Sequence, residues 1–153
     1  MKNVVILDLD GVLILTPPWK SDKIDVDGYS EFDKQSVTNL NILMSKIDAE
    51  LWLSSNRRFG MTLEKFRQIF IYRKIEAPLI GFLPLNNLNT LRKDEVNIFL
   101  DQEHVNNFLI LDDDKSLNSL PLERRLFWVA TDPMIGFNSE KLNEAEALAG
   151  KWK

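Results

Sequence analysis

Short apolar runs of strand length recur along the chain, and between them apolar residues return every three or four positions. Runs rich in β-branched and aromatic residues predict strands, whereas the three-to-four spacing predicts amphipathic helices. Strands that alternate with helices are typical of a mostly parallel α/β sheet. The pattern therefore predicts one α/β domain over residues 1–153, with helices on both faces of a five-stranded sheet. The predicted strands are Val4 to Leu7, Glu50 to Leu53, Pro78 to Leu83, Phe108 to Leu111 and Leu126 to Ala130.

Residues that can accept a hydrogen bond from the backbone stand just before the segments with helical spacing. A side-chain oxygen at this place satisfies one of the N–H groups that the first turn of a helix leaves without a partner. We therefore expect helices to begin at Asp33, Thr62, Thr90 and Ser139.

The segment over residues 12–32 has no clear periodicity and directly follows the most polar strand end of the chain. It is consistent with either a β-hairpin or an ordered loop. A long segment without regular structure inside a compact domain is usually functional, so we expect a flap over a site. Its aromatic residues Trp19, Tyr29 and Phe32 offer a substrate platform, but aromatic residues in long loops more often anchor the loop to the core.

Polar residues follow directly after three of the predicted strands. The first strand ends at Asp8 and Asp10, the second at Ser54 and the fourth at Asp112. In an open parallel sheet the ligand site lies beyond the carboxyl ends of the strands, so we expect these side chains to meet at one edge of a Rossmann-like sheet. Lys93, at the start of the third predicted helix, is expected at the same edge.

Composition limits what such a site can hold. The chain has no cysteine and one histidine, which excludes a thiolate site and a zinc site built on several histidines. Carboxylates remain as metal ligands, and an all-oxygen ligand set suits Mg²⁺. The net charge of -4 offers no general attraction to nucleic acid or to an anionic membrane, so any nucleic-acid contact must be local. No apolar stretch approaches the length of a membrane span, and we expect a cytoplasmic protein that contacts no membrane.

Two carboxylates two residues apart at a strand end can act on a phosphate. If the strand geometry persists, the side chains of Asp8 and Asp10 share a face about 6–7 Å apart, and Gly11 then lets the backbone turn. A phosphate bound to Mg²⁺ beside a carboxylate permits in-line attack to give an aspartyl-phosphate, while a lysine offsets charge on the transferred oxygens. Ser54 can donate to one of those oxygens, and Asp10 can protonate the leaving group and later activate water.

These residues, in this order, resemble the four motifs of the haloacid dehalogenase (HAD) superfamily of phosphohydrolases. The first motif, an apolar run followed by D-x-D-G, is similar to Ile6 to Leu13, and the second, an apolar strand ending in serine or threonine, is similar to Leu51 to Ser54. Lys93 resembles the third motif, a lysine at a helix start. Phe108 to Asp113 resembles the fourth, an apolar strand ending in paired acids. The resemblance spans residues 4–114 and implies a magnesium-dependent phosphatase.

The same resemblance implies roles for the acidic residues. Asp8 would be the nucleophile and a ligand of Mg²⁺, and Asp10 would be the acid and base whose backbone carbonyl also binds the metal. Asp112 and Asp113 would be the remaining protein ligands of the metal. Asp114 stands next in the row and is an alternative to either of them.

Ser54 and Lys93 would position the phosphoryl group, although Arg92, beside Lys93, is an alternative cation. The remainder of the chain, including the turn from Thr131 to Gly136 and a C-terminal helix, further resembles small HAD-like domains associated with bacterial RNA-repair proteins. The resemblance therefore implies a repair-associated phosphohydrolase.

Functions from other classes compete with this interpretation. A receiver domain of two-component signalling is also a small α/β domain with a phosphoaccepting aspartate and Mg²⁺. Its acidic pair lies on the first strand, its phosphoacceptor ends the third and its lysine follows the fifth, an order that this chain does not share. A catalytically weak binding or regulatory module with the same fold is another alternative, which a phosphatase assay separates. The sequence points to no obligate partner protein.

The chain offers no separate cap over the expected site. The gap between Gly11 and Asp33 and the gap after Ser54 are each about twenty residues long, and chains below about 40 residues seldom sustain a core of their own. We therefore expect an open cleft that admits a phosphate on a large molecule, such as a nucleic-acid end or a protein, with a small-metabolite phosphatase as the alternative. The pair Arg57 and Arg58 is a candidate for binding a substrate anion, or else a solvated basic pair.

Overall fold

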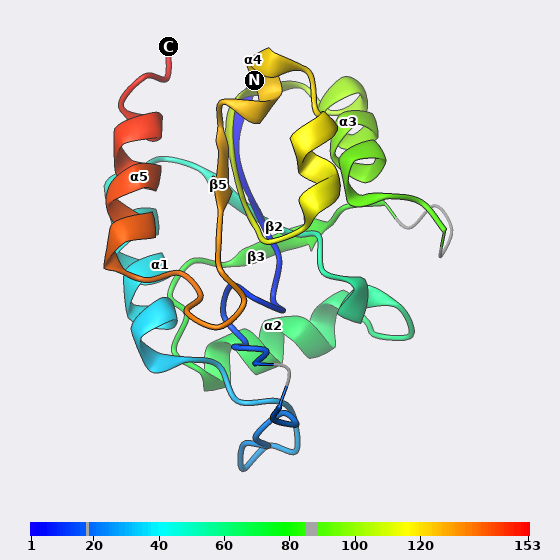
Figure 1. The fold of residues 1–153 in the computed structure, drawn as a ribbon, viewed down its shortest axis with the longest axis vertical. Helices are drawn as coiled ribbons and strands as arrows, with labels where there is room; N and C mark the ends of the chain where they lie inside the picture. Colours follow the sequence, from blue (N-terminus) through cyan, green and yellow to red (C-terminus); the bar gives the residue numbers. More distant parts are fainter. Residues whose placement is uncertain (18, 85–88) are drawn as a thin grey trace.

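The computed structural model describes residues 1–17, 19–84 and 89–153. Within them, five parallel strands form one sheet in the order β3-β2-β1-β4-β5, with helices packed on both faces (Figure 1). The predicted α/β class and the five-stranded sheet are confirmed. The strands are β1 (Lys2–Leu7), β2 (Glu50–Leu53), β3 (Leu79–Phe82), β4 (Val105–Asp112) and β5 (Trp128–Ala130).

Two of the four predicted helix starts are confirmed. Asp33 and Thr62 each accept a hydrogen bond at the N-terminus of a helix, from Ser36 N and Lys65 N. The prediction for Thr90 is wrong, because the helix is preceded by Leu91, which makes no side-chain cap. The helices are α1 (Lys34–Lys46), α2 (Leu63–Tyr72), α3 (Arg92–Gln102), α4 (Leu122–Arg125) and α5 (Ser139–Ala149), with 3₁₀ turns η1 (Asn56–Arg58) and η2 (Lys115–Ser119).

The prediction for Ser139 is one residue late. Asn138 is the capping residue, because its side-chain oxygen accepts from Lys141 N at 3.0 Å, and Ser139 is the first helical residue. The N-terminus of α3 has no side-chain cap, but two acids in its first turn, Asp94 and Glu95, interact favourably with the positive end of the helix dipole. None of the helices in the described part of the chain is long and apolar enough to cross a membrane.

Alternate residues of β1 enter two separate cores. Val5 and Leu7 pack with residues of α1, α2 and α5 on one face of the sheet. Val4 and Ile6 pack on the other face with Val96 of α3 and with residues of η2. Successive side chains of a strand point to opposite faces, so an apolar run without polar interruption is expected for a strand covered on both sides.

The strand order places a topological switch between β1 and β4. The chain moves outward from β1 to β2 and β3, and then crosses back over β1 to β4 and β5. In such sheets the ligand crevice lies outside the carboxyl ends of the strands where the order reverses. The receiver alternative is wrong, because receiver domains have the order 2-1-3-4-5.

The segment over residues 12–32 is an ordered loop with a small hairpin-like end, and its residue 18 lies outside the described residues. Glu31 N donates to Lys23 O at 2.7 Å, and the bridges in the described part of this segment are isolated ones. Phe32 is buried in the core and Tyr29 packs edge-on against Phe66, so the expected anchoring is confirmed for both. It is wrong for Trp19, whose exposed fraction is 67%.

Candidate active site

The polar residues that end three adjacent strands share one face of the sheet. Ile6 of β1 stands in register with Trp52 of β2 and Ile110 of β4, and all three contact the core on the α3 face. Because side chains alternate along a strand, the residues two positions further on face the same way. These residues are Asp8, Ser54 and Asp112.

Backbone hydrogen bonds extend the sheet as far as these residues. Asp8 N donates to Leu111 O at 3.0 Å, and Ser54 N donates to Leu7 O at 2.8 Å. The chain then turns sharply, since Leu9 O accepts from the backbone N–H groups of Leu13 and Ile14, each at 2.9 Å. The buried hydroxyl of Ser54 has no hydrogen-bond partner within the described part of the chain. A buried polar group without a partner is unfavourable, so Ser54 fits a ligand that accepts from it.

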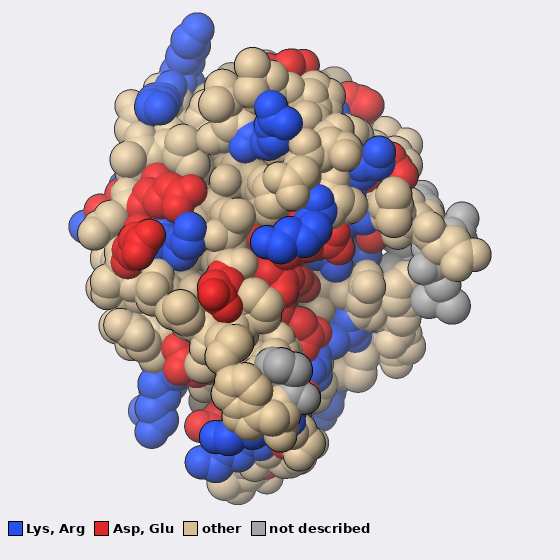
Figure 2. Space-filling model, in the orientation of Figure 1, with Lys and Arg blue, Asp and Glu red and all other residues tan. Residues whose placement is uncertain are grey.

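Asp8, Asp112 and Asp113 form a cluster of carboxylates. One carboxylate oxygen from each lies within 4.8 Å of the others, which makes the group able to hold a metal ion. The exposed fraction of Asp8 is 5%, and Asp112 is fully buried. Acidic side chains reach the surface near the middle of the face in Figure 2, where the carboxyl ends of β1 and β4 lie in Figure 1.

Asp114 has a different role from its two neighbours. Its Oδ1 accepts from Ser116 N at 2.9 Å and so caps η2, and its own N–H donates to Asp112 Oδ1 at 3.0 Å. The structure thus brings Asp112 and Asp113 to Asp8, whereas the Asp114 carboxylate is directed to the backbone of η2.

The cluster is electrostatically unfavourable with protein groups alone. Burial raises the pKa of Asp8 well above its usual range, and the neighbouring Asp112 carboxylate raises it further. Burial also raises the pKa of Asp112. The pKa of Asp113 is raised to about 6, by burial and by repulsion from Asp112. In each case the charged carboxylate is disfavoured, and a bound cation would favour it.

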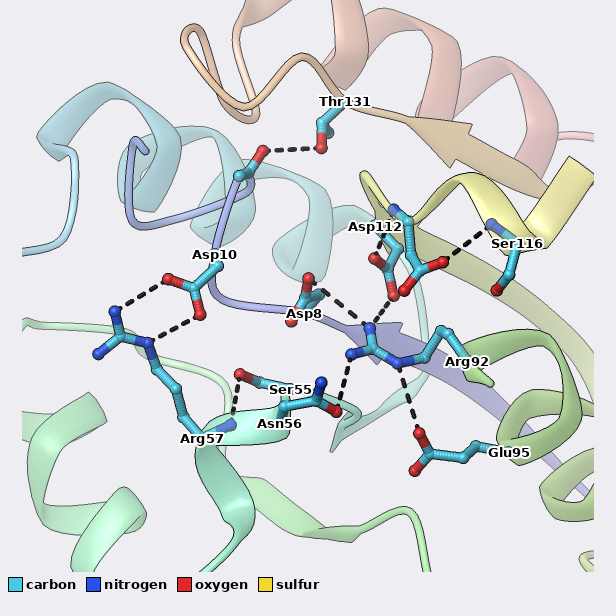
Figure 3. A network of polar contacts seen from close by, with 12 residues as sticks. Asp8, Asp10, Ser55, Asn56, Arg57, Arg92, Glu95, Asp112, Ser116 and Thr131 are labelled. Carbon is cyan, nitrogen blue, oxygen red and sulfur yellow. Dashed lines mark hydrogen bonds and ion pairs between the residues drawn. The ribbon is translucent and has the colours of Figure 1, made fainter. Parts of the chain in front are cut away.

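Arg92, the first residue of α3, extends its guanidinium into this cluster (Figure 3). Its Nη1 lies 3.6 Å from Asp8 Oδ2 and forms an ion pair with Asp112, and its Nη2 donates to Asn56 Oδ1 at 3.4 Å. Burial acts to lower the pKa of Arg92, but the Asp112 and Asp8 carboxylates raise it overall. Lys93 is half-buried, and its backbone N–H donates to Ser116 Oγ at 3.2 Å.

Asp10 is held by Arg57 through both carboxylate oxygens. Arg57 Nε donates to Oδ2 at 2.8 Å and Nη2 donates to Oδ1 at 2.9 Å (Figure 3). Arg58, in contrast, is fully buried, where Nη1 donates to Leu83 O at 2.7 Å and Nη2 forms an ion pair with Glu95. The expectation of a solvated basic pair is therefore wrong, and neither guanidinium is free for a substrate anion.

Some residues of the site carried little signal in the sequence. Glu95 forms ion pairs with both Arg58 and Arg92 and joins η1 to α3, but a glutamate in the first turn of a helix is common. Thr131 donates from Oγ1 to Gly11 O at 2.7 Å and so supports the turn after β1. Its position directly after β5 follows the same rule of polar strand ends that singled out Asp8 and Ser54.

Comparison with known protein families places most of the chain in a family. Residues 4–142 match the family described as the HAD domain in Swiss Army Knife RNA repair proteins. No curated protein matches the chain, and no solved structure matches it. The matched range contains β2 to β5, β1 from Val4 onward, and the residues of the site described above.

Proposed function

The chain belongs to the family of HAD domains in Swiss Army Knife RNA repair proteins, and from this premise we propose that it is a magnesium-dependent phosphomonoester hydrolase with Asp8 as its nucleophile. One observation carries the proposal. The buried Asp8 carboxylate lies between two further carboxylates and the hydroxyl of Ser54 on the neighbouring strand end, which has no hydrogen-bond partner among the described residues. Acidic residues alone repel a phosphate, so this arrangement suits a phosphate accompanied by a cation.

The residues of the cluster fit Mg²⁺. Asp8, Asp112 and Asp113 offer oxygen ligands, and burial raises the pKa of all three, with repulsion from Asp112 adding to the rise at Asp8 and Asp113. A divalent cation would favour their charged forms. The backbone carbonyl of Asp10 is the further ligand that the HAD resemblance implies. When bound, Mg²⁺ supplies positive charge to the phosphoryl oxygens and orients the phosphate.

The side chains divide the chemistry between them. The Asp8 carboxylate forms a bond to phosphorus as the bond to the leaving oxygen breaks, and Asp10 gives that oxygen a proton. Asp10 then takes a proton from water, which attacks the aspartyl-phosphate, releases inorganic phosphate and restores Asp8. The Ser54 hydroxyl donates to a phosphoryl oxygen throughout.

A cation beside Asp8 completes the proposed site. Lys93 occupies the motif position for this role, but the guanidinium of Arg92 already lies 3.6 Å from Asp8. We assign the role to Arg92, because its contacts with Asp8 and Asp112 hold it where the transferred charge would develop. Lys93 then binds η2 through its backbone and remains the alternative.

We further propose a large phosphorylated substrate, with a nucleic-acid end preferred to a protein. The family description supports a link to RNA repair, and the 41% exposed side chain of Asp10 indicates a site open at its acid. Arg57 and Arg58 do not support this choice, since both are already engaged. A small-metabolite phosphatase and a catalytically weak binding module remain the competing functions.

Turnover of p-nitrophenyl phosphate separates an enzyme from a binding module. We expect turnover with Mg²⁺, loss of turnover in excess chelator, and a phosphorylated peptide containing Asp8 after acid quenching. Full turnover in chelator would contradict the metal requirement. No turnover of any phosphate offered would favour the binding module.

Comparison of kcat/KM values addresses the substrate. Oligonucleotides with a 3′- or 5′-phosphate are compared with the matching mononucleotides and with sugar phosphates. We expect the oligonucleotides to have the highest kcat/KM, because an open site gives little enclosure to a small molecule. Much faster turnover of a small metabolite would contradict the proposal of a large substrate.

A further inference from the structure

Arg57 connects the acid of the site to the flap over residues 12–32. On one side it holds both oxygens of Asp10, at 2.8 and 2.9 Å. On the other side its Nη2 donates to Asp22 Oδ2 at 2.6 Å and its Nη1 donates to Ser30 Oγ at 3.1 Å. The Ser30 hydroxyl in turn donates to Asp22 Oδ2 at 2.7 Å, which closes a ring of hydrogen bonds. Figure 3 shows the part of this network around Asp10.

Every N–H of the Arg57 guanidinium is engaged. An arginine side chain has five N–H donors. Asp10 takes one from Nε and one from Nη2, Asp22 takes the second from Nη2, and Ser30 and Tyr29 take those of Nη1, the last at 3.4 Å. A phosphate could be bound only by breaking one of these bonds. The geometry therefore indicates that Arg57 holds protein groups.

Asp10 needs such a contact because packing does not fix it. Its side chain is 41% exposed, and it follows the end of β1, where the chain has begun to turn. A general acid must stand within hydrogen-bond reach of the leaving oxygen, and small displacements are costly in rate. A two-point contact from a planar guanidinium fixes both position and rotation of a carboxylate. A carboxyl group has about four acceptor sites, so two hydrogen bonds leave room for the transferable proton.

The flap is a fixed support for Arg57. Independently of Arg57, Arg73 at the end of α2 donates to Asp27 Oδ2 at 2.6 Å and to Ser30 O at 2.9 Å. Arg73 also stacks 4.7 Å from the ring centre of the buried Phe32. Of these two arginine contacts with the flap, that of Arg57 reaches Asp10 and that of Arg73 does not.

We propose that Arg57 is a positioning residue for Asp10, and that Asp22 and Ser30 of the flap hold Arg57 in place for this role. The inference rests on the proposed function, because it gives Asp10 its part as the acid. It assigns the flap a contribution to leaving-group protonation, in addition to any contact with substrate. A loss of the flap contact should then have the kinetic signature of a weakened acid.

The test compares two substrates of the same shape. p-Nitrophenyl phosphate has a good leaving group that needs little protonation, whereas phenyl phosphate has a poor one. Asp10→Asn serves as the reference for loss of the acid, and we expect its kcat to fall at least about tenfold more on phenyl phosphate than on p-nitrophenyl phosphate. Arg57→Met should show the same pattern with little change in KM, and Arg57→Lys, which keeps the charge without the fork, should fall between it and wild type.

Two flap variants separate positioning from general loosening. Asp22→Asn removes the charge that holds Arg57, and it should repeat the preference for good leaving groups to a smaller degree. Asp27→Asn is the matched control, because it weakens the Arg73 anchor without touching Arg57 or Asp10. We expect it to change the rates on both substrates by the same factor.

The possible results are distinct. An equal fall on both substrates in Arg57→Met and Asp22→Asn would show a structural role and overturn the inference, while wild-type turnover would still support the proposed function. A rise in KM on both substrates, with kcat unchanged, would make Arg57 a substrate ligand and also overturn it. Wild-type protein without turnover on either substrate would overturn the proposed function and this inference together.

Discussion

A Cβ atom added to Gly11 would lie 2.2 Å from Oδ2 of Asp113. Gly11 also has a φ of +81°, which residues with a side chain rarely adopt. Two segments far apart in the sequence therefore meet at a point where only glycine fits. The glycine that follows the Asp8–Asp10 pair is required both for the turn and for the position of a carboxylate in the proposed metal site.

We predict that Gly11→Ala weakens Mg²⁺ binding as well as stability. The backbone strain should cost about 1–2 kcal/mol, and the Asp113 carboxylate must move away from Asp8 and Asp112. Gly28→Ala is the matched control, since Gly28 has a φ of +85° but its added Cβ would meet no atom of the described residues within 4 Å. Urea unfolding with and without Mg²⁺ measures both effects. Equal loss of Mg²⁺-dependent stability in the two variants would contradict the role of the Asp113 contact.

The sheet could be predicted because local patterns and tertiary packing agree there. The run at β1 is apolar on both faces, as a central parallel strand must be, and the Asp33 and Thr62 caps lie where a side-chain acceptor precedes an apolar spacing. The predicted helix start at Thr90 was wrong because the start of α3 is stabilised by charges near the helix dipole and by buried ion pairs. A local sequence pattern shows neither of these. The sequence pattern missed the first residues of β1 and β4, which begin at Lys2 and Val105. Polar residues such as Asn3 and Asn107 join the sheet there by pairing with each other, and the apolar pattern does not show this pairing.

The acidic cluster could be predicted from strand ends alone, because parallel strands bring their carboxyl ends to one edge. The contacts of the arginines could not. The sequence around the three arginines does not distinguish their roles. Arg57 holds Asp10. Arg58 is buried against Glu95, and Arg92 reaches Asp8. Their partners come from segments far away in the chain, and which arginine meets which acid depends on the register and the helix rotation.

We predict that Asp8→Asn abolishes turnover while the fold is kept. The amide has nearly the shape of the carboxylate but cannot act as the nucleophile, so kcat should fall by at least about 10³-fold. The metal-free variant should unfold at a higher temperature than metal-free wild type, because burial and repulsion from Asp112 disfavour the Asp8 carboxylate and the amide carries no charge. Thermal unfolding in chelator and a phosphatase assay check the two parts. Near-normal turnover would exclude Asp8 as the nucleophile.

We predict that the metal-free protein loses stability as the pH rises through about 6. The pKa of Asp113 is about 6 in the folded chain, whereas an unfolded aspartate has a pKa of about 3.9. Between these values the folded state binds more protons than the unfolded state, so the free energy of unfolding decreases as pH rises. Mg²⁺ binds the ionised carboxylate of Asp113. Added Mg²⁺ should therefore raise the free energy of unfolding more at about pH 7 than at about pH 5.

The Asp113→Asn variant is the control for this pH dependence. It lacks the titrating carboxyl, so its metal-free stability should depend less on pH over the same range. The measurement is the midpoint of thermal unfolding against pH, in chelator and in saturating Mg²⁺. A Mg²⁺ effect of the same size at both pH values would contradict protonation of the cluster in the metal-free state.

The last prediction concerns the cation beside Asp8. Removing one partner of a buried ion pair leaves an uncompensated charge, so Arg92→Met should cost about 3–5 kcal/mol of stability, through the carboxylates of Asp112, Glu95 and Asp8. Added Mg²⁺ should restore part of that loss, because it offers the same carboxylates another positive charge. Lys93→Met should change stability by no more than about 0.5 kcal/mol, as expected of a residue away from such a pair.

The kcat values of Arg92→Lys and Lys93→Met show whether Arg92 or Lys93 acts on the phosphate. Arg92→Lys keeps the charge but loses the planar fork, whose Nη1 contacts both Asp8 and Asp112 while Nη2 contacts Asn56. We therefore expect a folded protein whose kcat falls by about 10- to 100-fold. Lys93→Met should keep most of its kcat, since the contact of Lys93 with η2 is made by its backbone. A large fall in kcat for Lys93→Met, with Arg92→Lys close to wild type, would return the role to Lys93. In that case Arg92 would serve the stability of the acidic cluster, and the side chain of Lys93 would have to reach the phosphate when substrate binds.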